Sequence, residues 1–152
     1  MNHVMYSGMQ SWYYTNLIGL TQAMGVAGAG YAHFRVAPQV PTGLAGAALT
    51  YQTDGGEIRV QWSQGNATAS SLTTRFALSV TVPVSAIAEL CVPTFGRTAA
   101  QAHVTESGKE AWAAGNFSAT AGCTGASASV LGDTTEICFT CGCGSYELAL
   151  LI

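Results

Sequence analysis

The chain has 152 residues, enough for one domain with a single core, and 49% of them are hydrophobic while only 9% are charged. Soluble domains carry about 25% charged residues, so this surface relies on Ser, Thr, Gly and Ala, which suits a glycan coat or burial against neighbouring subunits. The net charge of −3 excludes a basic patch for nucleic acid or anionic lipid, and no apolar run reaches the length of a membrane span. Because the N-terminus lacks the basic stretch of a signal peptide, we expect a mature chain or a fragment.

Five cysteines stand in the second half of the chain, and their odd number predicts one thiol that is free, buried or linked to another chain. The run from Cys138 to Cys143 has the spacing C-x-x-C-x-C. A zinc site needs four ligands and this run offers three, so we predict no metal and no cofactor. Disulfides fit better, because the run lies in a β-like stretch beside Gly142 and Gly144. The disulfide candidates are Cys91, Cys123, Cys138, Cys141 and Cys143.

Two N-glycosylation sequons lie in Gly- and Ser-rich turns, at Asn66-Ala67-Thr68 and Asn116-Phe117-Ser118. Combined with the cysteines and the low charge, they predict an extracellular or cell-surface location.

The first element is predicted to be an amphipathic helix within residues 1–20, because apolar residues recur there at steps of three and four. Residues 21–30 contain three glycines without a strong period and are predicted to be a linker. The apolar face of the helix requires a cover, so we predict that it mediates assembly. The residues expected to do so are Val4, Met9, Trp12, Leu17 and Leu20.

Residues 31–152 are predicted to form a β-sandwich domain. A strand over residues 44–52 runs into the turn Thr53-Asp54-Gly55-Gly56, and the return strand at 57–62 alternates cleanly between apolar and polar residues. The clearest strand covers 72–82. Shorter strands are expected at 34–36, 87–92, around Val104, 136–140 and 146–152. Seven or eight short strands bounded by turns predict a mostly β fold, an antiparallel β-sandwich preceded by one helix.

Several segments resemble one known family. Met-Asn-His-Val-Met-Tyr-Ser-Gly-Met-Gln-Ser-Trp-Tyr-Tyr at residues 1–14 is similar to the Asn-His…Gly…Trp-Leu-Tyr helix that closes the catalytic barrel of bacterial and fungal α-L-rhamnosidases. Gly-Tyr-Ala-His-Phe-Arg-Val-Ala-Pro at 30–38 resembles the entry into that family's C-terminal sandwich. Further similarities follow in order at residues 44–51 with 56–62, 80–83, 104–109 and 144–148.

This resemblance implies a chain without its own catalytic site. The family inverts configuration with two carboxyl groups, and both lie in the α/α barrel upstream of the matched segment. Only His3 matches a family position near the bound rhamnose, where an imidazole can donate a hydrogen bond to sugar hydroxyls. The cysteine run departs from the family pattern.

Other chemistry is weakly indicated by the residues themselves. Glu106 and Glu110 flank a Ser-Gly turn and are predicted to be solvated, and no catalytic role is predicted for His33 or His103. Tyr51 and Trp112 are the aromatic residues that we expect to stack on a sugar ring.

Three functions remain open at this stage. The chain is predicted to be a non-catalytic α-L-rhamnosidase C-terminal-like domain with a structural or assembly role, such as an extracellular filament subunit that self-associates through its helix. It could alternatively be the C-terminal fragment of an active α-L-rhamnosidase, with the missing barrel as its partner. The third alternative is a carbohydrate-binding module that recognises glycans.

Overall fold

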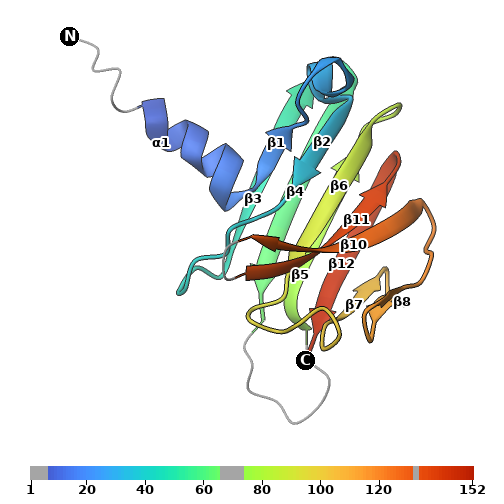
Figure 1. Cartoon of the computed structure of the whole chain (residues 1–152). Coiled ribbons are helices and arrows are strands. Elements are labelled where there is room, and N and C mark those ends of the chain that lie inside the picture. Colours follow the sequence, from blue (N-terminus) through green and yellow to red (C-terminus); the bar gives the residue numbers. More distant parts are fainter. Residues whose placement is uncertain (1–6, 66–73, 132–133) are drawn as a thin grey trace.

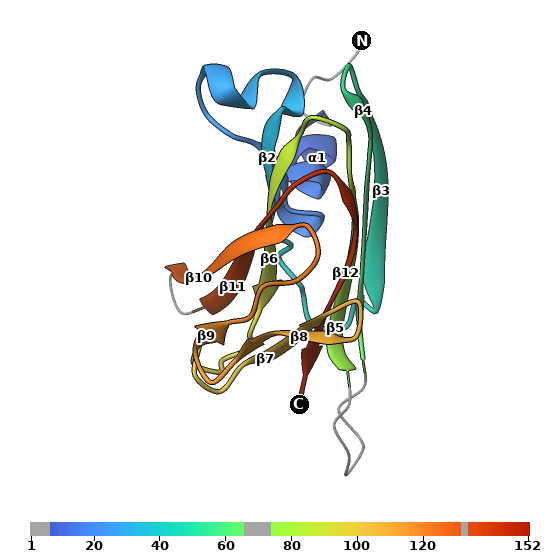
Figure 2. The same ribbon diagram turned by 90° about the vertical axis from the view of Figure 1, so that its right-hand side faces the viewer.

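The computed structural model describes residues 7–65, 74–131 and 134–152, and within them twelve strands form two sheets that pack face to face (Figures 1 and 2). In the five-stranded sheet the order is β1-β2-β6-β11-β10, with bounds β1 Leu20–Gln22, β2 His33–Val36, β6 Ile87–Pro93, β11 Thr134–Cys141 and β10 Cys123–Leu131. In the seven-stranded sheet the order is β3-β4-β5-β12-β7-β8-β9, with bounds β3 Gly46–Thr53, β4 Gly56–Gln64, β5 Thr74–Val82, β12 Gly144–Leu151, β7 His103–Glu106, β8 Lys109–Ala113 and β9 Asn116–Phe117.

The predicted mostly β sandwich is confirmed. The strand pairs are antiparallel except for β2 with β6, which is parallel. The predicted hairpin is also confirmed, because β3 pairs with β4 across the expected turn and Thr53 Oγ1 donates a hydrogen bond to the Gly56 carbonyl at 2.7 Å. Alternation places Ile58, Val60 and Trp62 in the core, as predicted.

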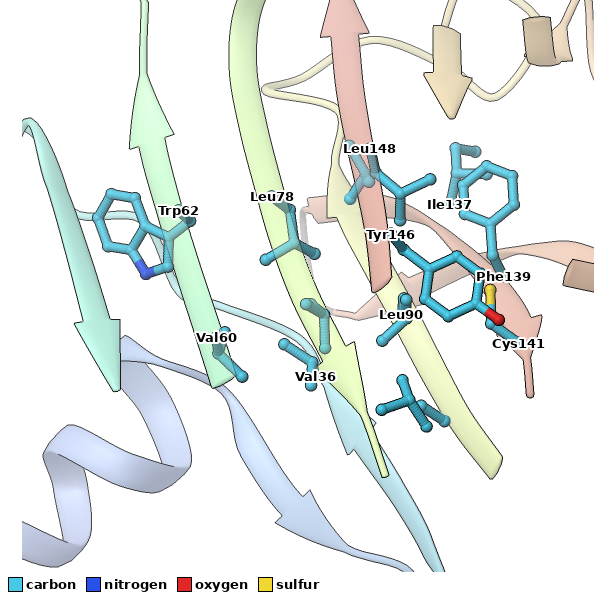
Figure 3. Packing of buried hydrophobic residues seen from close by; sticks show 14 of the residues in the cluster. Val36, Val60, Trp62, Leu78, Leu90, Ile137, Phe139, Cys141, Tyr146 and Leu148 are labelled. Carbon is cyan, nitrogen blue, oxygen red and sulfur yellow. The ribbon is translucent and has the colours of Figure 1, made fainter. Parts of the chain in front are cut away.

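The core fills the space between the two sheets. Side chains of β4, β5 and β12 meet those of β2, β6 and β11 there, as Figure 3 shows. The labelled members are Val36, Val60, Trp62, Leu78, Leu90, Ile137, Phe139, Cys141, Tyr146 and Leu148. This arrangement turns alternate residues of the five-stranded sheet toward its outer face.

The N-terminal helix ends earlier than predicted. Its described part consists of α1 (Ser7–Trp12) and a π-helical turn, η2 (Tyr13–Leu17), while Leu20 begins β1. Gly19 ends the helix because it has a φ of 76°, and a Cβ there would lie 2.1 Å from the Ala37 carbonyl carbon. A helix through this point would collide with the chain that follows β2.

Residues 21–30, predicted to be a linker, contain regular structure. Thr21 and Gln22 pair with β2, and a 3₁₀ segment, η3, covers Val26–Tyr31. No helix among the described residues has the length and apolarity needed to cross a membrane.

Two of the predicted assembly residues belong to the core of the chain itself. Leu17 and Leu20 are buried, because the first packs at the end of η2 and the second faces the sandwich interior from β1. Met9 and Trp12 remain exposed. Val4 lies outside the described residues. The predicted apolar face is therefore reduced to a smaller surface on α1.

Candidate functional site

Three charged side chains meet on the outer face of the five-stranded sheet. Because Phe34 and Val36 point into the core, Arg35 of β2 points outward. It lies opposite Glu89 of β6 in the parallel register, and its Nε is 3.3 Å from Glu89 Oε2. The Nη2 atom of Arg35 donates a hydrogen bond to Glu136 of β11. One guanidinium thus links three adjacent strands of the sheet.

The carboxyl group of Glu136 is buried in this cluster, with 8% of the residue exposed. Burial raises its pKa above the ordinary value, the Arg35 charge opposes that rise, and the Glu89 charge adds to it. Both carboxylates contact the same guanidinium. They form ion pairs with it.

A disulfide lies beside the three charges. Cys91 and Cys138 are opposite partners on β6 and β11, and they are joined. The Arg35 Nη2 atom is 3.7 Å from Cys138 Sγ. Glu89 stands close to both sulfur atoms, in a geometry that resembles a metal site. Because the two sulfurs are bonded to each other, they offer no thiolate to a metal in this state.

The predicted disulfides are present, and the structure resolves their pairing. The second bridge joins Cys123 of β10 to Cys141 of β11, which are also opposite partners. Cys138 and Cys141 point to opposite faces of β11, so they do not pair with each other. Cys143 is exposed and free, which is one of the three outcomes that the odd count allowed.

A pocket of about 560 Å³ opens beside the charged cluster. Its walls combine polar side chains with proline and aromatic surface, notably Thr21, Arg35, Gln39, Glu136, Pro38 and Phe95. The Phe95 ring packs against Phe76, at 5.9 Å between ring centroids, and the Arg75 guanidinium lies 4.8 Å from the centroid of the Phe95 ring. This pocket can receive a small ligand that offers both hydroxyl groups and an apolar face.

The predicted sugar-stacking residues do not lie together. Trp112 is only 5% exposed, and its Nε1 donates a hydrogen bond to the Ala99 carbonyl at 2.8 Å, so the expectation that it stacks on a sugar is wrong. Tyr51 is half-buried on β3, where its ring lies 5.0 Å from that of Tyr31. His3 and Asn66 lie outside the described residues, whereas Asn116 is exposed at the start of β9.

The sequence did not reveal two polar contacts near the end of the seven-stranded sheet. His103 Nε2 lies 3.3 Å from Glu110 Oε2, across β7 and β8, although the two residues are seven positions apart in the sequence. Glu106 is buried rather than solvated, and it accepts a hydrogen bond from the Ser107 hydroxyl at 2.5 Å. Neither contact adjoins the pocket described above.

Comparison with known proteins identifies the relatives of this sandwich. The family model of the bacterial alpha-L-rhamnosidase C-terminal domain matches residues 24–107, more than half of the chain. The chain belongs to this family. The resemblance seen in the sequence is thereby confirmed. A comparison with curated proteins finds no match.

Solved structures extend the similarity of this rhamnosidase C-terminal domain to almost its whole length. The α-L-rhamnosidase from Dictyoglumus thermophilum matches with a TM-score of 0.70 and 19% identity over 97% of this chain, which covers 14% of that enzyme. The Streptomyces avermitilis α-L-rhamnosidase, solved in complex with L-rhamnose, matches with a TM-score of 0.65 and 20% identity. The match covers 97% of this chain and 11% of that enzyme. These identities show a common fold. A match to so small a share of each enzyme fits a non-catalytic C-terminal domain.

The rhamnosidase C-terminal domain presents one further surface, on α1. Met9 is 76% exposed and Trp12 is 52% exposed. Together with Gln10, Tyr13 and Tyr14 they line an open hollow. Apolar side chains that gather in one exposed patch commonly mark a contact surface.

Proposed function

We propose that the chain is a structural domain that covers the helical catalytic part of a larger α-L-rhamnosidase-type protein. The observation that carries this proposal is the family match, combined with the 11–14% of the solved enzymes that the chain spans. The larger protein would supply the catalytic barrel, and this chain would stabilise it.

The α1 surface is the part of the domain that we assign to this contact. Met9 and Trp12 face solvent, and leaving apolar area in water costs about 25 cal/mol per Å². The rings of Tyr13 and Tyr14 extend the surface toward β3, where they contact Ala48 and Tyr51. Among the described residues, no charged side chain lines this hollow, which favours an apolar partner such as packed helices.

The contacts of four described carboxylates support a role without catalysis. Glu89 and Glu136 contact Arg35, Glu110 contacts His103, and Glu106 accepts a hydrogen bond from its neighbour. None of these contacts places two unpaired carboxyl groups across a pocket from each other, which is the arrangement that most glycoside hydrolases use. The reaction of the whole protein would belong to the part that this domain covers.

An extracytoplasmic location belongs to the same proposal. Two disulfides persist in oxidising compartments and are rare in the cytosol. The exposed position of Asn116 leaves its sequon open to a glycosyltransferase.

The test is to capture the native protein with an antibody raised against the recombinant chain. We expect an immunoblot species several times larger than 15.6 kDa, and captured material that hydrolyses an aryl α-L-rhamnoside. The recombinant chain alone should show no hydrolysis. An antibody pre-absorbed with the chain is the control. A native species of 15.6 kDa without activity would contradict the proposal and favour a self-assembling subunit.

Carbohydrate binding is a second candidate, and the outer pocket is the observation that favours it. Thr21, Gln39 and Glu136 offer hydrogen-bonding groups, and Phe95 offers an aromatic wall. Titration with neutral monosaccharides, including L-rhamnose, should shift amide resonances of β2 and β11, and Thr21→Val should weaken the response. Resonances that stay unchanged at tens of millimolar sugar would eliminate this candidate.

A further inference from the structure

The two sheets have four edges, and the structure protects them unequally. The five-stranded sheet ends at β1 and β10, and the seven-stranded sheet ends at β3 and β9. Edge strands present unpaired N–H and C=O groups that can pair with another chain, and short edges limit this risk. β1 has three residues and β9 has two, whereas β3 has eight and β10 has nine.

The edge of β3 is partly covered by the N-terminal helical segment. The Tyr13 hydroxyl donates a hydrogen bond to the Ala48 carbonyl at 2.7 Å, which uses an acceptor of this edge. The Tyr14 and Tyr31 rings pack around Tyr51 of the same strand, at 6.1 and 5.0 Å between centroids. A second strand could approach β3 only by displacing these groups.

The edge of β10 has no such cover among the described residues. Its sequence, Cys-Thr-Gly-Ala-Ser-Ala-Ser-Val-Leu, contains no charge and no proline, the devices by which natural edge strands repel other chains. A register shift at Cys123–Gly125 and a bridge to Thr120 affect only one end. Between Gly125 and Val130, the backbone hydrogen bonds of the described chain run to β11 alone. Figure 2 shows β10 at the free margin of its sheet.

We propose that two copies of this chain pair antiparallel through their β10 edges, joining two five-stranded sheets into one of ten strands. An antiparallel strand is complementary to its own copy under two-fold symmetry. The uncharged edge lets the two copies approach without repulsion, and its Ala and Ser side chains leave room for that approach. Val130, which is 71% exposed, would be partly buried by the second copy.

Pairing through β10 limits the assembly to two copies. Each copy offers one long open edge among the described residues, so pairing consumes it and the complex closes as a dimer. A filament would need a second open edge of similar length. This assembly surface is separate from α1, and the pairing does not depend on the function proposed above.

The test compares charge variants in a Cys143→Ser background, which removes dimers linked by the exposed thiol. Ala128→Lys places like charges close together across the new strand pair, and Val130→Lys places a charge near its end. Gln61→Lys is the matched control, because it adds the same charge to an exposed position of β4, an interior strand. Sedimentation velocity and hydrogen exchange are measured over a wide concentration range, and circular dichroism checks the fold.

We expect the Cys143→Ser protein and the Gln61→Lys control to form dimers as concentration rises, with alternate β10 amides becoming protected at the same concentrations. The two β10 variants should stay monomeric while keeping the fold. Three results would overturn the proposal: a monomer at every concentration, dimers that the folded β10 variants form equally well, or dimers whose β10 amides stay unprotected.

Discussion

The Trp62 indole on β4 donates a hydrogen bond from Nε1 to the backbone carbonyl of Leu17 at 2.9 Å, inside the core. Leu17 is the last residue of η2, so this bond fixes the end of the N-terminal helical segment to the seven-stranded sheet. Trp62 also stacks on Phe76, with 6.2 Å between ring centroids. The C-terminal end of the N-terminal helical segment is therefore packed into the sandwich, while α1 extends outward from it (Figure 1).

Replacing Trp62 by Phe should destabilise the domain. Loss of the indole N–H leaves the Leu17 carbonyl without its donor, at a cost of about 1–3 kcal/mol, and the smaller ring adds a packing loss. Urea unfolding measures the change. Trp12→Phe on the exposed surface of α1 is the control and should stay within about 0.5 kcal/mol of the wild type. Equal effects of the two substitutions would contradict the role given to Trp62.

The two disulfides should contribute unequally to stability. Cys91–Cys138 closes a loop of sequence separation 47, and Cys123–Cys141 closes one of 18. Chain entropy then predicts losses of about 4 and about 3 kcal/mol when each pair is replaced by Ala. Thermal or urea unfolding of both double variants in a Cys143→Ser background gives the comparison. A larger loss from the shorter loop would show that local packing outweighs the entropy of the unfolded chain.

Glu136 should make stability depend on pH. Because burial raises its pKa in the folded state above the ordinary value of 4.5, the folded protein binds this proton more tightly than the unfolded chain does. The resulting stabilisation is fully present below the unfolded pKa and is lost as pH rises through the folded pKa. The unfolding free energy of wild type minus that of Glu136→Gln should therefore fall with rising pH from about 4 to 8.

Glu147→Gln controls for the loss of one carboxylate, since Glu147 is exposed on β12. If the unfolding free energy of wild type minus that of Glu136→Gln stays constant or rises with pH, the Arg35 ion pair outweighs the effect of burial on the Glu136 pKa.

Local patterns in the sequence predicted the parts of the fold that depend on local chemistry. Alternation in residues 57–62 is a property of one strand with one buried face, and it identified all three core residues there. The predicted extension of the helix to Leu20 is wrong. Leu17 and Leu20 are spaced as in a helix, but the backbone turns at Gly19 between them and enters β1. The small residues of β10 have weak strand propensity, so that strand was not predicted.

The polar cluster and the cysteine pairing depend on the order of the strands in the sheet, which local sequence patterns do not predict. Arg35 and Glu136 are 101 residues apart and meet only because β6 lies between β2 and β11. The same strand order selects Cys91 and Cys138 as partners. Trp112 was misjudged because the register shifts between Val104 and Thr105, which turns both Ala111 and Trp112 inward.

Asn116 should carry a glycan when the chain passes through a eukaryotic secretory pathway. It is exposed directly after the tight turn formed by Ala114 and Gly115, and its Nδ2 makes only a 3.2 Å hydrogen bond to the nearby Ala114 carbonyl. Mass spectrometry before and after enzymatic deglycosylation should place sugar on this residue. Asn116→Gln and Ser118→Ala should both remove it, because each destroys the sequon, whereas Ser118→Thr preserves the sequon and should retain the glycan. Secreted protein with an unmodified Asn116 would show that exposure and the sequon are insufficient at this turn.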